Sequence, residues 1–465
     1  MTESPAPDEQ PKRWPGRRVR VVLYIVAALA AADLVATAVT GLMLRSEVSK
    51  LRAGGYLPPT AQVVPHVPSG QANAADVYLL SFTARQLRDS EETDLVSGRP
   101  DRWRPADLLH ARRVLAANAE HFRILEQASR IPGCAFPVDW NAGPAMTFPH
   151  LAEFRRSARL LSAKAGIAAY DRRIDDALAD CGTMLRMAEH AKCEPSLISQ
   201  LVAYALQDMA VQSVKNALSV DAPSPKAARD LLAQLSTVDN GEPLVRTLKG
   251  EIELFGMKTF DIARNANSRE FQGLFGDDDD ARRAWQGRVL RAYGTIARPL
   301  ANLDEIAYLR TMKSGIDAVS QPWPRSRERL DAVSQSVNDL PTYRSLLTKT
   351  LFNLSNRTLE SRESRTAALR AAQIGLALVI YKSERGSYPD SLAALENAGS
   401  KLPADPFTGK PFRYVRSGDG FVVYSLGPDM QDQGGRPISL YAPHVPRGEA
   451  KKRAQEFDIP FRVPR

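Results

Sequence analysis

An apolar run near the N-terminus is the clearest feature of the hydrophobic pattern. Residues 21–44 are apolar apart from Asp33 and a few small polar side chains. As a helix with a rise of about 1.5 Å per residue, this run would be about 36 Å long, enough to cross roughly 30 Å of hydrocarbon. Basic side chains between residues 12 and 20 favour a cytoplasmic N-terminus. The pattern predicts a disordered cytoplasmic tail over 1–20 and a transmembrane helix over 21–44.

A cleaved signal peptide is the alternative interpretation of this run. Residues 21–32 would form its apolar core, and the small residues at 36–38 would form its cleavage site. The apolar pattern continues past that site to Leu44, which favours a retained anchor. We therefore expect a single span in the inner membrane of a bacterial cell, with the bulk of the chain on the extracytoplasmic (periplasmic) side.

Apolar residues at helical spacing dominate the middle of the chain. Prolines and glycines between residues 54 and 70 predict a linker, placed at 45–72, before a helical domain that spans 73–341. Residues 148–192 show the pattern best, as two helices joined by a short turn into an αα-hairpin. No repeat with a period of about 34 residues is visible, so the packing is repeat-like without evidence of a regular array. The predicted helices are 73–90, 105–130, 148–170, 174–192, 196–219, 224–236, 243–264, 279–294 and 299–318.

The last part of the chain, residues 342–465, combines a helix with a hairpin. An apolar stripe from Leu369 to Ile380 predicts a helix over 364–385, and Gly386 supplies the left-handed residue that commonly follows a helix end. Two short alternating segments around a glycine-rich turn follow as strands. Because two strands alone are marginal in water, the hairpin must pack on the helix. The predicted strands are 412–414 and 421–425.

Composition and charge narrow the class of protein. A chain of 465 residues with 44% hydrophobic and 25% charged side chains is ordinarily globular and long enough for two or three domains. The net charge of +9 comes without a long basic block or a nucleic-acid motif, so we expect no nucleic-acid partner. The three cysteines show no metal spacing and leave two alternatives, one disulfide with a spare thiol or three buried thiols.

The helical domain carries no visible catalytic signature. Nucleophile-elbow, phosphate-loop, dinucleotide and zinc-protease motifs are all absent from the sequence. The six histidines form no pair at i, i+4, and we expect them singly at the surface or in capping positions. The sequence identifies no small-molecule substrate and favours a non-enzymatic role. A hydrolase whose catalytic residues converge only in the fold is one alternative, and a secreted helical-repeat binding protein is another.

An acidic, glycine-rich loop follows the hairpin. Asp429 and Asp432 lie in it, and Gly434 and Gly435 close it. Carboxylates and bent backbone carbonyls gathered in one loop are the oxygen ligands that calcium uses. The spacing differs from that of an EF-hand, and a plain turn explains the same residues.

The stretch from Tyr381 to Gly435 resembles the C-terminal globular domain of the major pseudopilins of type II secretion systems. In that family a calcium site is built from S-x-G-x-D, two glycines and a later D-I pair. By position, Asp429 is similar to the first carboxylate, Asp458 to the closing one, and Asp432 is a third candidate ligand. The resemblance therefore implies a bound Ca²⁺ held by these three carboxylates, across a gap at 436–457 that is longer than the family's.

The chain from residue 70 to its end also resembles a group of bacterial membrane-anchored proteins with a helical domain and this ending. That resemblance implies an architecture and no activity. The predicted fold is mainly α, with an N-terminal transmembrane helix, an αα-hairpin or repeat-like helical domain and a small α+β pseudopilin-like domain. The prepilin cleavage motif is absent. We expect an anchored scaffold that displays the last domain to envelope or secretion-system proteins.

Overall fold

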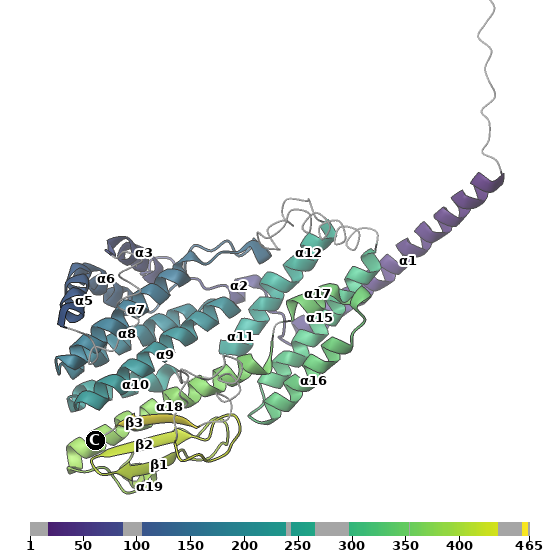
Figure 1. Cartoon of the computed structure of the whole chain (residues 1–465). Coiled ribbons are helices and arrows are strands. Elements are labelled where there is room, and N and C mark those ends of the chain that lie inside the picture. The colour runs from purple at the N-terminus through teal and green to yellow at the C-terminus, as the bar shows by residue number, and fades with distance from the viewer. Residues whose placement is uncertain are drawn as a thin grey trace, which may run out of the picture.

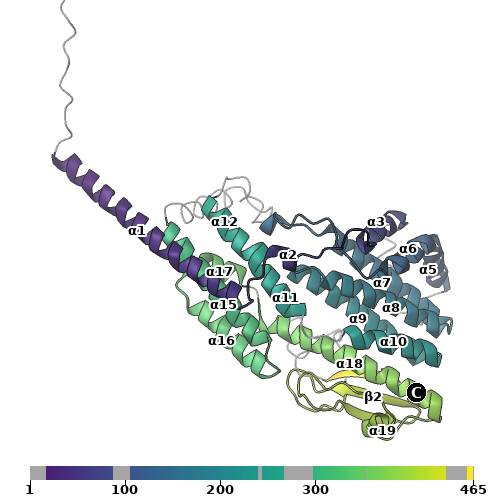
Figure 2. The same cartoon turned by 180° about the vertical axis from the view of Figure 1, so that it is seen from behind.

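The structure is a computed structural model that describes residues 17–86, 105–238, 243–265, 297–352, 354–435 and 458–463. Within these ranges the chain is mainly helical and carries one small three-stranded sheet. Figures 1 and 2 show a body of packed helices, with α1 projecting from one end and the sheet along the lower edge. The predicted mainly α fold with a long N-terminal apolar helix is confirmed.

Short connections join the helices of the body. Those predicted between residues 148 and 236, and the one at 299–318, are confirmed to within two residues at each end. The helix predicted at 73–90 stops at Ala84, and the one predicted at 279–294 lies outside the described residues. Helices α16 and α17 were not predicted. The helices are α2 (Thr60–Val63), α3 (Ala74–Ala84), α5 (Pro105–Ala117), α6 (Ala119–Ser129), α7 (Pro149–Tyr170), α8 (Ile174–Lys192), α9 (Leu197–Val220), α10 (Pro225–Val238), α11 (Pro243–Gly250), α12 (Met257–Asn265), α15 (Arg298–Val319), α16 (Arg325–Asp339) and α17 (Leu346–Leu351).

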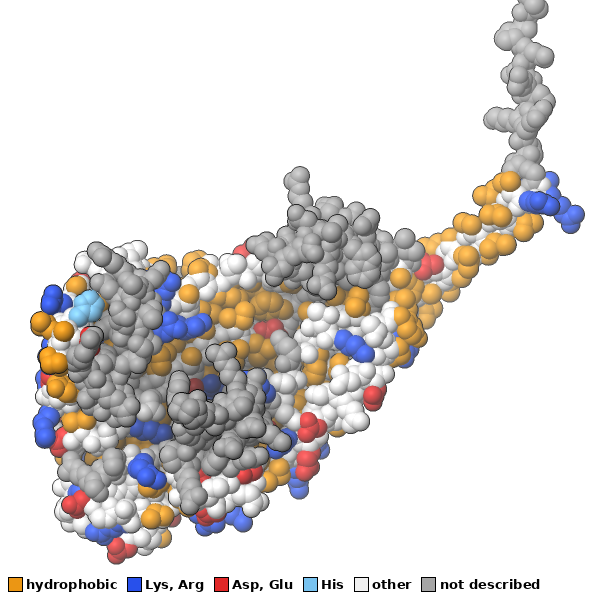
Figure 3. Space-filling view, in the orientation of Figure 1, with side chains coloured by type: hydrophobic (Ala, Val, Ile, Leu, Met, Phe, Trp, Pro, Cys, Tyr) orange, Lys and Arg blue, Asp and Glu red, His pale blue; other side chains and the backbone are white. Residues whose placement is uncertain are grey.

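Helix α1 (Arg17–Ala53) projects from the body through its first half. The apolar window of this helix is wholly exposed, and α1 is long and apolar enough to cross a membrane. Figure 3 shows the apolar surface along the projecting arm, with basic side chains at its outer end. An exposed apolar surface of this extent is unfavourable in water and suits the interior of a bilayer.

The second half of α1 packs along α15. The Asn302 amide donates to the Thr40 hydroxyl at 3.1 Å, and Arg310 pairs with Glu47 at 2.9 Å. These contacts keep α1 helical beyond the end of its apolar run. The linker predicted over 45–72 is therefore wrong in its first part, because those residues continue the helix and dock on the body.

A buried asparagine breaks the helix predicted at 105–130 into α5 and α6. The Asn118 side chain accepts the Gln86 N–H at 2.8 Å and donates to the Gln86 carbonyl at 2.7 Å. It also donates to the Val114 carbonyl at 2.9 Å. Asparagine side chains compete with the helix for backbone hydrogen bonds, and here that competition ends one helix and starts the next.

The helix predicted at 243–264 is interrupted by a π-helical turn between α11 and α12. Gly256 ends the turn, and a Cβ atom there would lie 2.3 Å from the Tyr308 side chain, so the close approach requires glycine. At the start of the turn, the Glu251 carboxylate accepts the Leu197 N–H at 2.7 Å. A half-buried carboxylate is thus held at the irregular part of the helix.

The pH dependence of stability should report on Glu251. Burial raises the pKa of this carboxyl from 4.5 to about 7, although the Leu197 N–H lowers it. The folded state therefore holds a proton that the unfolded state releases, and the resulting stability is lost as pH rises from about 4.5 to about 7. We expect Glu251→Gln to be more stable than the wild type by about 1–3 kcal/mol at pH 8 and equal to it near pH 4.5.

Urea unfolding of both proteins across this pH range measures the difference. Glu396→Gln, at an exposed carboxylate of the C-terminal part, is the matched control and should follow the wild type. A wild type and Glu251→Gln that keep the same difference at every pH would contradict the assignment.

The C-terminal part is a small antiparallel sheet backed by one long helix. Helix α18 (Asn356–Arg385) starts before the predicted residue 364 and ends at Gly386, whose φ of 82° confirms the predicted left-handed residue. The strand order is β1-β2-β3, with both pairs antiparallel. The first two strands match the predicted hairpin, whereas the third was not predicted. The remaining elements are α19 (Leu392–Asn397), β1 (Arg413–Ser417), β2 (Gly420–Ser425) and β3 (Ile459–Val463).

Helix α18 lies between the sheet and the helical body (Figures 1 and 2). On the sheet side, Gly375 lets the ring of Phe461 on β3 approach so closely that a Cβ atom would lie 2.4 Å from it. On the other side, Gln373 donates to the Leu235 carbonyl of α10 at 3.0 Å. Buried apolar residues of both parts form one continuous core, so the boundary predicted after residue 341 does not separate two cores.

Candidate functional site

The acidic loop lies between β2 and β3, and the fold brings its distant carboxylate back to it. Asp458, directly before β3, accepts the N–H of Gln433 at 3.0 Å and that of Gly435 at 2.8 Å, both on Oδ2. Gly434 and Gly435 have φ values of 72° and 70°, which curl the loop toward this carboxylate. The structure therefore brings Asp458 together with the loop that carries Asp429.

Two buried acceptor oxygens in this loop have no donor among the described residues. Asp458 is 1% exposed, and its Oδ1 is unpartnered. The Oε1 atom of Gln433 is also buried and unpartnered. A buried polar atom without a partner is costly, and a bound cation is one partner that such an oxygen can take.

The charges around Asp458 also favour a bound cation. Burial raises the pKa of this carboxyl, and the negative charges of Asp432 and Asp429 raise it further, against the lowering by two backbone N–H groups. Negative charges that raise the pKa of a neighbouring carboxyl favour a proton or a cation at that carboxyl. The loop thus gathers negative charge that a metal ion would stabilise.

Asp429 and Asp432 differ in how far their oxygens are already used. Asp429 accepts the Gln431 N–H at 3.0 Å and the Gln433 side-chain amide at 2.9 Å. Asp432 accepts the Tyr424 hydroxyl at 2.9 Å, and its other oxygen lies 3.4 Å from Arg413 Nε. Since Arg413 already neutralises Asp432, that carboxylate is the least suited of the three to a metal.

The carboxylates of the loop do not converge on one point as a complete set of metal ligands would. Over the described ranges, no group of three or more His, Cys, Asp or Glu side chains is placed to hold a metal ion. Calcium also takes amide and carbonyl oxygens, so Asp458, Asp429 and the Gln433 amide are the residues that fit it. Asp432 fits through its charge rather than through a free oxygen.

Asp405 is a residue of this site that the sequence did not single out. Its carboxylate is buried and accepts the Ser425 hydroxyl at 2.8 Å, the Phe407 N–H at 3.0 Å and the Leu426 N–H at 3.2 Å. These bonds tie the end of β2, and hence the start of the loop, to the proline-rich segment before β1. Asp405 is therefore a positioning residue, and the run Ala404-Asp405-Pro406 was its only sequence signal.

Three of the histidines are buried inside the helical body, which corrects the expectation of surface or capping positions. They are His121, His150 and His190, while His444 lies outside the described residues. His150 Nε2 lies 2.7 Å from Glu194, whose other oxygen accepts the Ser199 hydroxyl at 2.6 Å. The glutamate stands between the serine and the histidine, so these groups do not form a serine–histidine nucleophile pair.

The cysteines are free thiols in the structure, and none is paired. Cys134 and Cys181 are buried among apolar side chains, and burial raises the pKa of both thiols. Cys193 is half-buried, so the structure has three unpaired thiols of which two are buried, rather than the three buried thiols of the second alternative.

Comparison of the chain with protein-family models, with curated proteins and with solved structures finds no match. Function is therefore inferred from the chemistry of the chain itself.

Proposed function

We propose that this chain is a non-enzymatic, membrane-anchored protein that holds a pseudopilin-like unit outside the inner membrane for interaction with envelope or secretion-system proteins. The exposed apolar half of α1 supports the anchor. The basic residues that precede the apolar run support a cytoplasmic N-terminus and an extracytoplasmic body. The loop motif and the helix that backs the antiparallel sheet support the pseudopilin-like interpretation of the C-terminal unit.

The proposed role is display rather than filament growth. The first half of α18 carries charged side chains that form ion pairs within the body. Glu363 is buried and ion-paired with Arg362, and Arg365 pairs with Asp208 of α9 at 2.9 Å. A helix engaged in this way is not free to pack through its apolar surface with copies of itself.

Calcium is the proposed ligand of the loop. The observation that carries this proposal is the buried, unpartnered Oδ1 of Asp458, on a carboxylate that also accepts the backbone N–H of Gln433, whose own amide oxygen is unpartnered. Asp458, Asp429 and Gln433 would hold the ion, with Asp432 adding negative charge nearby. A bound cation would tie β3 to the loop and thus stabilise the sheet that α18 covers.

Thermal melting with and without calcium tests this site. A ligand that binds only the folded state stabilises it by RT ln(1 + [L]/Kd), which is about 2.7 kcal/mol at a hundredfold excess over Kd. We expect millimolar calcium to raise the melting temperature of the wild type. Asp458→Asn should lose the rise, because it removes the charge of the only buried carboxylate among the proposed ligands.

Asp390→Asn is the control for this experiment. Asp390 carries a carboxylate of the same C-terminal unit, but its side chain is 94% exposed and pairs with Arg416 outside the loop. Its melting temperature should rise with calcium as the wild type's does. A wild type that does not respond, or an Asp458→Asn variant that still does, would remove the calcium site.

Fractionation and co-purification test the anchor and the interaction. The wild type should stay in membranes after alkaline carbonate washing, and its body should be open to protease added outside the inner membrane. Envelope proteins recovered with the wild type, and lost with Asp458→Asn, would support display through the loop. A mature N-terminus near Val39, with the protein in the soluble fraction, would instead support the secreted binding protein.

A further inference from the structure

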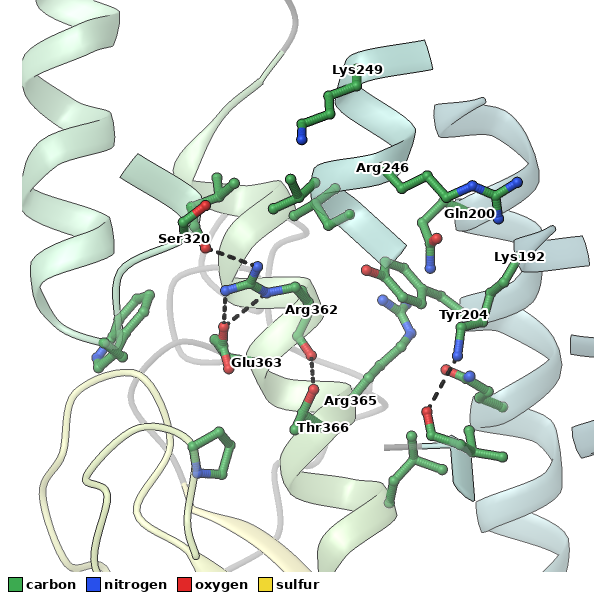
Figure 4. A pocket seen from close by; sticks show the side chains of 18 of the residues that line it. Lys192, Gln200, Tyr204, Arg246, Lys249, Ser320, Arg362, Glu363, Arg365 and Thr366 are labelled. Carbon is green, nitrogen blue, oxygen red and sulfur yellow. Dashed lines mark hydrogen bonds and ion pairs between the residues drawn. The ribbon is translucent and has the colours of Figure 1, made fainter. Parts of the chain in front are cut away.

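A half-open cleft of about 820 Å³ lies in the body, away from the acidic loop. Helices α9, α11 and α18 and the end of α15 form its walls, and Pro58 and Gln62, which follow α1, complete one side. Figure 4 shows Arg362 and Arg365 on α18 across the cleft from Arg246 and Lys249 on α11. A volume of this size holds a small organic ligand.

The side chains that line the cleft are predominantly positively charged. Six Lys or Arg side chains line the cleft, against one carboxylate, that of Glu363, over the part of the chain that the structure describes. The cations are Lys192, Arg246, Lys249, Arg362, Arg365 and Arg370.

Some of these cations are neutralised by carboxylates of the body. Arg362 is paired with Glu363, and Arg365 with Asp208 at 2.9 Å. Lys192 is paired with Glu189 at 2.8 Å. These three therefore add little net charge and serve mainly to shape the walls.

The cations of α11 are different. Arg246 donates to backbone carbonyls, those of Val63 at 3.1 Å and Cys193 at 2.8 Å, and forms no ion pair with a carboxylate in the described ranges. Lys249, one helical turn further on, has no hydrogen-bond or ion-pair partner there. Two positive charges on one helix face thus remain available to a ligand.

The floor of the cleft holds an unsatisfied amide. Gln200 is 1% exposed, and neither its Oε1 nor its Nε2 makes a well-formed hydrogen bond among the described residues, the Tyr204 hydroxyl being a weak contact. Burial raises the pKa of this hydroxyl, against the lowering by the positive charges of Arg362 and Arg365. A buried amide without partners is costly, and a ligand oxygen at this point would accept its N–H.

We propose that this cleft binds a phosphoryl-bearing anion, held by Lys249 and Arg246 and oriented by the Gln200 amide. Lysine and arginine side chains are the usual protein groups for phosphate, and charge-assisted hydrogen bonds to it are the stronger kind. The proposal is independent of the calcium loop. Two sources supply the same chemistry, namely a phosphorylated molecule in solution and the headgroup of an anionic phospholipid.

Titration calorimetry on the full chain in neutral detergent, without calcium, tests the proposal. One arm uses pyrophosphate and the other a water-soluble short-chain phosphatidylglycerol. We expect the wild type to bind at least one of them, and the tighter one identifies the source. Lys249→Gln and Gln200→Leu should each weaken that binding about tenfold, because each removes a donor to the anion.

Two controls accompany the titration, one for binding and one for folding. Lys401→Gln removes an exposed cation far along the chain and should bind as the wild type does. Melting of Gln200→Leu without ligand should show a protein at least as stable as the wild type, since the substitution removes an unsatisfied buried amide. No binding of either probe by the wild type, or equal binding by Lys249→Gln and Lys401→Gln, would overturn the proposal.

Discussion

Gly375→Ala is expected to destabilise the protein by about 2 kcal/mol, although alanine is normally the better helix former by about 1 kcal/mol. The reason is the contact between α18 and β3. A Cβ atom at this position would lie 2.4 Å from Cε1 and 2.6 Å from Cδ1 of Phe461, which is fully buried. The ring cannot move aside without giving up its own packing, so the added methyl group separates the helix from the strand. Urea unfolding measures the loss.

A second substitution identifies the cause of that loss. Phe461→Val removes the whole ring and leaves room for the methyl group. In this background Gly375→Ala should cost little or should stabilise the helix, so the two changes are strongly coupled in a double-mutant cycle. A stabilising Gly375→Ala in the otherwise unchanged protein would show that α18 does not pack on β3 in this way.

Asp304→Ala is expected to cost about 3–5 kcal/mol, because one buried carboxylate holds the start of α17. Asp304 is 0% exposed in α15 and accepts the N–H of Leu347 at 2.8 Å and that of Thr348 at 3.0 Å. The Thr348 hydroxyl donates to the same carboxylate. Alanine leaves the two backbone N–H groups buried without an acceptor, and α17 loses its cap, while the Thr348 hydroxyl keeps the main-chain carbonyl of residue 304 at 2.9 Å.

Asp339→Ala provides the comparison for this prediction, because Asp339 is an exposed carboxylate at the end of α16. Its effect should stay within about 0.5 kcal/mol. Asp304→Asn should fall between the two, since an amide keeps one acceptor oxygen and turns an NH₂ group toward the remaining donors. Equal stability of the two alanine variants in urea unfolding would contradict the role given to Asp304.

Local patterns were sufficient for the elements that depend on neighbouring residues. The apolar run of α1, the stripe of α18 and the left-handed Gly386 are all local signals, and each is present. The end of α1 was misplaced because residues 45–53 are held by α15, far along the sequence. The break at Asn118 was missed for the same reason, since the side chain acts on Gln86 in another segment.

The candidate sites show the same difference between local and non-local signals. Asp429 and Asp432 could be identified from the sequence because acids and glycines lie close together there. Asp458 is distant in sequence and was supplied by the resemblance. Asp405 could not be picked out, because its partner Ser425 lies across the hairpin. The basic cleft was not visible at all. Its residues come from α9, α11, α15 and α18, and only the packing of these helices brings their charges together.

The uninterrupted course of α1 also determines how the body is carried. The segment suited to the bilayer and the segment docked on α15 belong to a single helix, so no hinge separates them. In the proposed anchored state, a body joined to α1 in this way would not swivel about a linker, so the tilt and rotation of α1 in the bilayer would set which surface of the body faces the lipid and how far the sheet stands from it.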